Sequence, residues 1–171
     1  MGNIGRATAA RFAAIGARVI GVNRTVREVP GVEKVYPTAE LAEAVREADA
    51  IVNTLPQALD TDKLLSAEVW ANVRPGVIFA STGRGTCVDE DALVEALRDG
   101  RVGFAAMDVF AVEPLPADSP LWGMENVLVA PHTGALNDAE DELIARMFAE
   151  NARRLLDGEE LVNTIDRVNF Y

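Results

Sequence analysis

ASTGRGTCVDEDAL, residues 80–93, joins a predicted strand to a predicted helix. The apolar run 77–80 leads to Arg84, which has a glycine on each side, and Asp89 has the position of a helix N-cap before an apolar helical repeat. Arg84 is therefore expected on a loop just beyond the carboxyl end of a strand, the edge where open parallel sheets bind ligands. A guanidinium there, with glycines that let a backbone approach closely, suits a carboxylate or carbonyl group held by two hydrogen bonds. The alternative is a surface arginine in a turn.

Strand and helix patterns alternate along the rest of the chain. Short runs rich in β-branched residues predict strands, and apolar residues spaced three or four apart predict helices. This alternation is typical of βαβ units, so we expect an α/β fold with a parallel sheet and no internal domain boundary. The predicted strands are 17–22, 49–54, 77–80, 102–107 and 127–130, the predicted helices are 6–15, 38–45, 66–73, 90–98 and 137–156, and 26–37 is predicted to be a loop with a short extended piece.

The chain opens on a glycine turn that leads into a predicted helix. Gly2 and Gly5 match the last two glycines of the dinucleotide-binding pattern G-x-G-x-x-G. The first glycine of that pattern, and the strand that should precede it, are absent from the sequence. The turn therefore predicts a dinucleotide site from half of a fingerprint, and the alternative is a glycine turn that only starts a helix.

The segment that follows the next predicted strand bears on the choice of cofactor. Asn23, Arg24 and Thr25 occupy the place where NAD-binding folds carry an acidic residue for the ribose 2′-hydroxyl. No carboxylate is present, and an arginine can pair with a 2′-phosphate, so the segment favours NADP(H) over NAD(H). The alternative is that Arg24 is only solvated.

The single histidine of the chain also follows a predicted strand. His132 is placed at the same ligand edge as Arg84, and Glu113 is presented by a proline-rich loop between them. A histidine beside a carboxylate can donate or accept a proton near neutral pH, and an arginine can clamp and polarise a 2-oxo acid. If the three side chains converge, they form an acid–base site; otherwise His132 is structural and Glu113 is a solvated loop residue.

Composition excludes several classes of function. The 171 residues carry a net charge of −11, which disfavours nucleic acid or an anionic membrane surface as a partner. The single cysteine, Cys87, excludes an internal disulfide framework and is interpreted as a packing residue in a reducing compartment. No signal peptide is recognisable, and no apolar run is long enough to cross a bilayer. We expect a cytoplasmic protein with no metal site.

Several motifs occur together in a fixed order. They are GNIG at 2–5, TGRG with VD within 82–89, MDVF followed by EP within 107–114, PLW followed by NV within 120–127, and PH at 131–132. In this order and spacing they resemble the D-isomer-specific 2-hydroxyacid dehydrogenase family over essentially the whole chain. The segment 23–25 resembles the glyoxylate/hydroxypyruvate reductase branch, which prefers NADPH. The resemblance implies an oxidoreductase with a Rossmann-type, doubly wound parallel sheet that lacks its first strand.

The resemblance also implies a role for each matching residue. Arg84 would bind the substrate carboxylate and carbonyl, His132 would protonate the carbonyl oxygen as hydride arrives from the nicotinamide, and Glu113 would orient His132 and favour its protonated form. Asp108 would hydrogen-bond the nicotinamide carboxamide. The other cofactor contacts would come from Gly2, Asn3 and Ile4 at the pyrophosphate, Asn23, Arg24 and Thr25 at the ribose, Thr54, Leu55 and Pro56 on the adenosine side, and Thr82, Gly83 and Gly134 at the nicotinamide.

Partners and missing parts follow from the same resemblance. Family members hold a small 2-oxo or 2-hydroxy acid between two domains and usually pair through the nucleotide-binding domain, so we expect NADP, or NAD, as cofactor and a homodimer. The first Rossmann strand and a substrate domain are missing, so 1–171 is expected to be an incomplete dinucleotide-binding domain, a fragment whose helix 137–156 exposes an apolar stripe. Two alternatives stay open: a catalytically silent nucleotide-binding or interaction module, and an enzyme like phosphoglycerate dehydrogenase.

Overall fold

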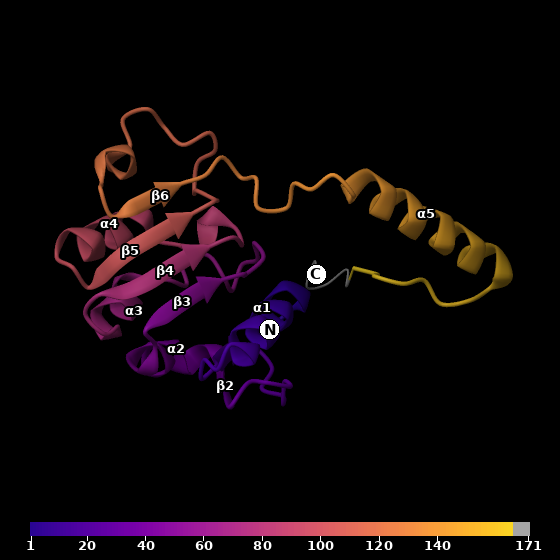
Figure 1. Ribbon diagram of the computed structural model, residues 1–171, viewed down its shortest axis with the longest axis horizontal. Helices are drawn as coiled ribbons and strands as arrows, with labels where there is room; N and C mark the ends of the chain where they lie inside the picture. Colours follow the sequence, from indigo (N-terminus) through magenta and orange to yellow (C-terminus); the bar gives the residue numbers. More distant parts are fainter. Residues whose placement is uncertain (166–171) are drawn as a thin grey trace. The chain divides into compact units, whose positions relative to one another are not determined.

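The computed structural model describes residues 1–165, which form two compact units, Met1–His132 and a second unit that starts at Thr133 (Figure 1). None of the described helices is long and apolar enough to cross a membrane. The second unit contains α5 (Glu140–Asp157). The first unit contains, in order, α1 (Asn3–Ala14), β1 (Ile20–Asn23), β2 (Lys34–Pro37), α2 (Leu41–Ala44), β3 (Ala50–Asn53), α3 (Ala67–Asn72), β4 (Val77–Ser81), α4 (Glu90–Arg98), β5 (Val102–Met107) and β6 (Val127–Val129), with short 3-10 helices at Thr38–Glu40, Val45–Glu47, Gly85–Cys87 and Pro120–Gly123.

The strands form two sheets, and every pair of neighbouring strands is parallel. β1 pairs with β2, while β3, β4, β5 and β6 form a second sheet in that order. The prediction of an α/β fold with a parallel sheet is therefore confirmed. The sheets are separated between β1 and β3, the position that the first strand occupies in a doubly wound sheet. The absence of that strand, predicted from the sequence, leaves two sheets in place of one.

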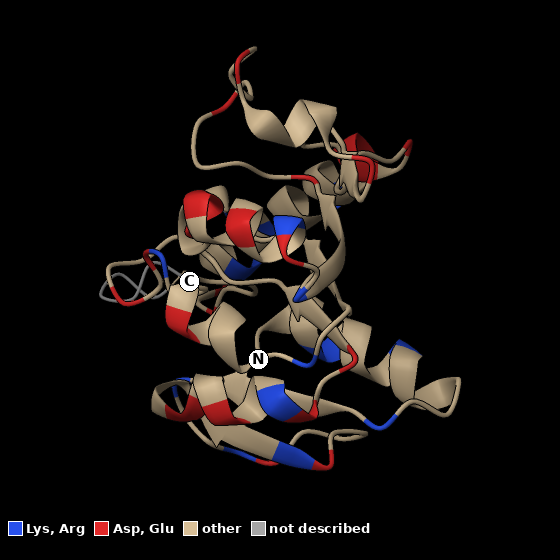
Figure 2. Ribbon diagram, turned by 90° about the vertical axis from the view of Figure 1, so that its left-hand side faces the viewer, with Lys and Arg blue, Asp and Glu red and all other residues tan. Residues whose placement is uncertain are grey.

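One face of the four-stranded sheet is buried under helices. Phe79 of β4 and Met107 of β5 are inaccessible to solvent and pack with Trp70 of α3 and Leu93 of α4. The rings of Trp70 and Phe79 meet edge to face, with their centroids 5.0 Å apart. The side chains that alternate with these along the strands are exposed, as Ile78 and Phe104 are, or half-buried, as Ala80 and Ala106 are. Charged side chains lie mainly on the helices and loops around the strands (Figure 2).

Most element boundaries agree with the sequence patterns, and the differences have local causes. Asp89 is the N-cap of α4, since its carboxylate accepts a hydrogen bond from the amide of Ala92. The predicted helix 38–45 is instead a short α2 between two 3-10 turns, so it is less regular than its apolar spacing suggested. The extended piece expected within 26–37 is β2, which is held by parallel pairing with β1.

Within the described residues, the second unit consists of α5, the segment 133–139 before it and the segment 158–165 after it. The helix begins at Glu140, later than the expected start at Asn137 or Asp138, because the Asn137 side chain accepts a hydrogen bond from the Ala139 amide and forms a turn there. Gly158 ends the helix in the left-handed conformation, with φ 72°, as its position predicted. The apolar stripe of α5 is exposed, and its members are Leu143, Ile144, Met147, Phe148, Leu155 and Leu156.

Candidate functional site

The carboxyl ends of four strands are aligned at one edge of the larger sheet. Asn53 of β3 lies opposite Ser81 of β4, Ser81 lies opposite Met107 of β5, and Met107 lies opposite Val129 of β6. The loops that leave this edge therefore start side by side. They carry most of the residues that the sequence placed near the nicotinamide and the substrate, namely Thr82, Gly83, Arg84, Asp108 and His132.

Two buried polar side chains hold these loops in place. The Asn53 side-chain amide donates to the Ser81 hydroxyl at 3.1 Å, and the Asn53 side-chain oxygen accepts from the Leu55 amide at 3.0 Å. Both side chains are almost completely buried, so their mutual hydrogen bond is needed to offset the cost of burying polar groups. Sequence reasoning gave neither residue a role, because Asn53 was placed inside a predicted strand and Ser81 just beyond one. Polar residues at the ends of two apolar strands were the signal that could have identified them.

The structure brings His132 and Glu113 together. His132 Nδ1 lies 2.8 Å from one carboxylate oxygen of Glu113, and the other oxygen accepts a hydrogen bond from the Phe110 amide at 2.9 Å. The Glu113 carboxylate is therefore fixed at both oxygens, and with Nδ1 protonated it orients the imidazole so that Nε2 is left for another partner. Both side chains remain accessible, at 43% for His132 and 37% for Glu113. This arrangement suits a group that must exchange a proton with a bound molecule.

The pair lowers the pKa of Glu113 below its ordinary value of 4.5. The main cause is the hydrogen bond with His132, and the Phe110 amide and the charge of Arg84 act in the same direction. A carboxyl group with a lowered pKa in the folded state stabilises that state above about pH 4.5, and the contribution is lost as the pH falls through the lowered value. Glu113 is thus held as the anion at neutral pH.

Replacing His132 by alanine should raise the pKa of the Glu113 carboxyl toward 4.5, because the largest cause of the lowering is removed. The measurement is a ¹³C NMR titration of the Glu113 side-chain carboxyl carbon in the wild-type and variant chains. Glu150 is an internal control, since Arg153 lowers its pKa through hydrogen bonds on α5 that the substitution leaves intact. An unchanged titration of Glu113 in the variant would contradict the coupling.

Arg84 lies close enough to the pair to act on it. Its guanidinium donates to the neighbouring Gly83 carbonyl at 2.9 Å, and its charge lowers the pKa of Glu113. The side chain is accessible, so the donors not used within the loop can meet a ligand. The three residues proposed from the sequence to form an acid–base site therefore stand at one edge of one sheet.

The glycines beside Arg84 have a different use from the one expected. A Cβ atom on Gly83 would lie 2.5 Å from the Leu55 carbonyl oxygen, and a Cβ atom on Gly85 would overlap the peptide bond between Phe110 and Ala111. Both glycines therefore allow close packing against the protein's own backbone, whereas the sequence suggested approach to a ligand. The contact at Gly85 fixes the Arg84 loop against the loop that carries Glu113.

Glu90 supports the same loop from the other side, and sequence reasoning missed it. Its carboxylate accepts a hydrogen bond from the Ala111 amide. Burial is the main cause that raises the pKa of Glu90, and the negative charges of Asp91 and Glu113 add to the effect. In the sequence, Glu90 was already explained as an acidic residue in the first turn of a predicted helix. Nothing therefore indicated that it also contacts this loop.

The amino end of α1 fits a phosphate group. Its N-cap, Gly2, makes no side-chain cap, and its first turn contains no acidic residue, so the first amides of the helix remain available to an anion. A Cβ atom on Gly2 would meet nothing within 4 Å, which leaves open space above the turn. Gly5 instead packs closely, since a Cβ atom there would lie 3.1 Å from the Thr54 hydroxyl. Asn3 and Ile4, expected at the pyrophosphate, form the exposed first turn.

The segment expected at the ribose follows β1. The Asn23 side chain donates to the Thr25 carbonyl at 2.8 Å, which folds the segment into a turn. Arg24 is half exposed and lies 3.6 Å from the Asp60 carboxylate. An ion pair this long between exposed groups is weak, so a phosphate can compete for the guanidinium.

The remaining expected cofactor residues are divided between the loops and the second unit. Leu55 and Pro56 follow β3, and Pro56 accepts a hydrogen bond from the Thr61 hydroxyl at 2.8 Å. Asp108 follows β5, and its amide donates to the Ser81 carbonyl. Gly134 belongs to the second unit. Within residues 1–165 no cluster of three or more histidine, cysteine or acidic side chains is arranged to hold a metal ion.

Comparisons with known proteins agree on one family. The family model described as D-isomer specific 2-hydroxyacid dehydrogenase, NAD binding domain, matches residues 1–134. Among curated relatives, glyoxylate/hydroxypyruvate reductase B of Escherichia fergusonii is 35% identical over 97% of this chain and 52% of its own length. D-3-phosphoglycerate dehydrogenase of Mycobacterium leprae is 36% identical over 97% of this chain and 31% of its own length. The chain thus spans about half or less of these relatives.

Solved structures show the same fold. A D-isomer specific 2-hydroxyacid dehydrogenase from Xanthobacter autotrophicus, in complex with NADPH and MES, matches with a TM-score of 0.92 and 38% identity over 99% of this chain and 69% of its own. An NADPH-dependent glyoxylate/hydroxypyruvate reductase from Sinorhizobium meliloti, in complex with NADP and sulfate, matches with a TM-score of 0.89 and 32% identity over 100% of this chain and 55% of its own. The similarity therefore extends beyond the residues that the family model matches.

Proposed function

Since this chain belongs to the D-isomer specific 2-hydroxyacid dehydrogenase family through its NAD binding domain, we propose that it binds NADP(H) and serves in the reduction of a small 2-oxo acid to a 2-hydroxy acid. The observation that carries the proposal is the His132–Glu113 pair, with Arg84 beside it, at the aligned carboxyl ends of four strands. A second, substrate-binding domain would complete the cleft in the whole enzyme.

The proposed cofactor position follows the same edge. The first turn of α1 would hold the pyrophosphate through its free amides, and Arg24 would pair with a 2′-phosphate on the adenosine ribose. Thr54, Leu55 and Pro56 would line the adenosine side, while Thr82, Gly83 and Asp108 would lie beside the nicotinamide. When bound, the nicotinamide supplies the hydride for the reduction.

The proposed chemistry of the chain's own residues is proton transfer and orientation. Arg84 binds the carboxylate of the 2-oxo acid and polarises its carbonyl group. His132 donates a proton from Nε2 to the carbonyl oxygen while the hydride reaches the carbonyl carbon, so the product is the 2-hydroxy acid. The Glu113 anion keeps Nδ1 protonated and stabilises the positive charge of the imidazolium before transfer.

Cofactor preference is tested at Arg24. The wild-type chain should bind NADPH more tightly than NADH, and Arg24→Ala should reduce that preference about tenfold, because a charge-assisted contact to the 2′-phosphate is lost. Dissociation constants for both nucleotides come from titrations that follow nicotinamide fluorescence. Arg27→Ala is the matched control, since it removes the same charge from the same exposed loop. Equal loss of preference in both variants would show that net charge, and not Arg24 itself, selects the cofactor.

Substrate class is tested by turnover in the whole enzyme. Glyoxylate and hydroxypyruvate should be reduced more efficiently than a phosphorylated three-carbon acid, because the segment 23–25 and the solved relative from Sinorhizobium meliloti both favour the reductase branch. The relative from Mycobacterium leprae gives specific support to the other choice, a phosphoglycerate dehydrogenase-like enzyme. A higher kcat/KM for the phosphorylated acid would establish that choice.

We further propose that the protein is cytoplasmic and forms a homodimer. Light scattering, which measures the molar mass in solution, tests the dimer.

A further inference from the structure

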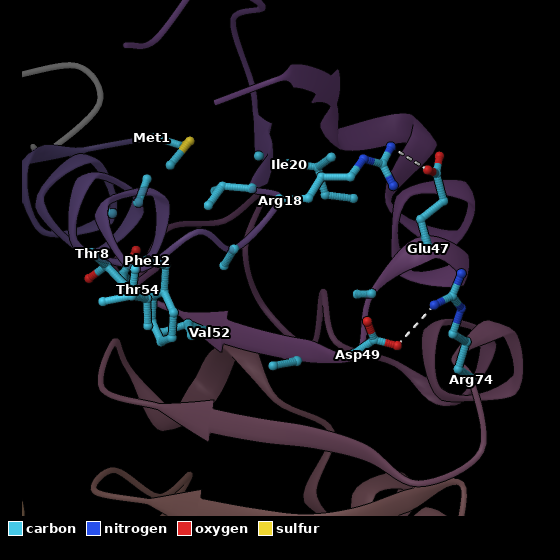
Figure 3. A pocket seen from close by; sticks show the side chains of 18 residues that line it. Met1, Thr8, Phe12, Arg18, Ile20, Glu47, Asp49, Val52, Thr54 and Arg74 are labelled. Atoms are coloured by element: carbon cyan, nitrogen blue, oxygen red, sulfur yellow. Dashed lines mark hydrogen bonds and ion pairs between the residues drawn. The ribbon is translucent and has the colours of Figure 1, made fainter. Parts of the chain in front are cut away.

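Two loops leave the carboxyl ends of β1 and β3, the strands on either side of the separation between the sheets. The groove between these strands has Arg18 and Asp49, each in an ion pair, at one end and Thr54 at the other (Figure 3). Arg18 lies shortly before β1 and Asp49 lies directly before β3, so both strands run toward the end where Thr54 lies. The turn 23–25 and the loop 55–61 therefore start at the same end of the groove, from opposite sides.

An ion pair joins these two loops. Arg24, just after β1, has its Nη1 atom 3.6 Å from Oδ2 of Asp60, in the loop after β3. The side chains are 47% and 51% exposed, so both can contact a bound molecule. Since the proposed function places Arg24 at the 2′-phosphate, the Asp60 carboxylate lies within one contact distance of the group that binds the same position of the ribose.

The turn that carries Asp60 is held by its neighbour, Thr61. The Thr61 side chain is buried, and its hydroxyl donates to the Pro56 carbonyl at 2.8 Å and accepts from the Ala58 amide at 2.9 Å. The Thr61 amide also donates to the Ala58 carbonyl at 3.1 Å. The fold thus fixes the turn from which the Asp60 carboxylate reaches Arg24.

A carboxylate at this place acts on the two cofactors in opposite directions. It can accept a hydrogen bond from the ribose 2′-hydroxyl of NAD(H), the task of the acidic residue that usually follows this strand and that Asn23 replaces here. Toward the 2′-phosphate of NADP(H) it is unfavourable, because its charge repels the phosphate and because it competes for the guanidinium of Arg24.

We propose that Asp60 is a specificity-determining residue of the cofactor site, which accepts a hydrogen bond from the 2′-hydroxyl of NAD(H) and limits the preference for NADP(H) that Arg24 creates. The inference rests on the proposed function, because it assumes a dinucleotide whose ribose meets Arg24. One pair of opposite charges, contributed by the loops after β1 and β3, then lets the chain bind both cofactors. Arg24 favours NADP(H), and Asp60 favours NAD(H).

The test compares dissociation constants of NADPH and NADH for the 171-residue chain and its Asp60→Ala variant, from titrations that follow nicotinamide fluorescence. The variant should bind NADPH about threefold more tightly, because repulsion and competition are removed. It should bind NADH about threefold more weakly, because the hydrogen-bond acceptor is lost. A residue that only holds its loop would change both constants in the same direction. Circular dichroism checks that the variant is folded.

Two further variants serve as controls. Asp60→Asn removes the charge but keeps an oxygen that can accept a hydrogen bond, so NADPH should still bind about threefold more tightly while NADH binding changes by less than about twofold. Asp62→Ala removes the same charge from an exposed position of the same loop, and it should change neither constant.

The double variant Arg24→Ala/Asp60→Ala shows whether the two residues act on the same phosphate. The gain in NADPH binding on replacing Asp60 should be smaller in the Arg24→Ala background, because no guanidinium is left to compete for. If Asp60→Ala changes neither constant, changes both in the same direction, or is matched by Asp62→Ala, the inference is wrong, even where Arg24→Ala removes the preference and so supports the proposed function. A wild-type chain that binds neither nucleotide would overturn both.

Discussion

Replacing His132 by glutamine in the whole enzyme is expected to lower kcat for glyoxylate reduction by about 100-fold or more, the usual contribution of a positioned general acid. Glutamine retains a hydrogen-bonding side chain of similar length, but it has no proton that it can transfer to the carbonyl oxygen. KM should change much less than kcat, because Arg84, and not His132, binds the substrate carboxylate. Steady-state kinetics in which glyoxylate is varied at saturating NADPH gives kcat and the KM for glyoxylate.

A companion pair of variants separates orientation from proton transfer. Glu113→Gln leaves His132 in place but removes the carboxylate that holds Nδ1, so kcat should fall and its pH dependence should shift. Glu125→Gln removes an exposed carboxylate between the same loop and β6, and it should behave as wild type. Turnover of His132→Gln within a few-fold of wild type would end the acid–base assignment.

Replacing Gly85 by alanine is expected to destabilise the first unit by about 2 kcal/mol or more, the cost of forcing extra atoms into a packed site. The added Cβ atom would overlap the peptide bond between Phe110 and Ala111, and a backbone contact cannot be relieved by rotating a side chain. For a chain of this size the melting temperature should fall by about 5 °C. The loops of Arg84 and Glu113 should also move apart, which weakens any site that needs both.

Gly123 provides the matched control. A Cβ atom there would meet nothing within 4 Å, so Gly123→Ala should change the melting temperature little. Differential scanning calorimetry of the two variants compares them directly. If both melt at the same temperature as wild type, the loops are not fixed against each other at Gly85.

The sequence predicted those features that depend on local pattern. Alternating strands and helices predicted the parallel α/β fold, and the position of Asp89 predicted a helix N-cap that the structure confirms. The positions just after each predicted strand indicated which side chains lie at one edge of the sheet, because parallel strands bring their carboxyl ends together. The half fingerprint at Gly2 and Gly5 predicted that one strand would be missing, and the sheets are separated at that place.

The features that the sequence did not predict depend on contacts between distant segments. Glu90 supports the loop of Glu113 only because the Ala111 amide lies within hydrogen-bonding distance of its carboxylate on α4. No local sequence pattern predicts that contact. The close packing of Gly85 has the same origin, since its neighbour is the backbone of residues 110 and 111. The roles proposed for Arg84, Glu113 and His132 stay predictions, because geometry places the groups without showing what they bind.

The most direct test of the central claim is a titration of the 171-residue chain with NADPH, followed by ¹⁵N NMR. NADPH should bind saturably and one to one, with the largest shifts at the amides of Asn3 and Ile4 and at residues 23–25, and NADH should bind more weakly. These shifts would place the dinucleotide along the carboxyl edge, from the first turn of α1 toward the loops of Arg84 and His132. Saturable binding that leaves the amides of Asn3 and Ile4 unchanged, or no binding of either nucleotide, would contradict the account.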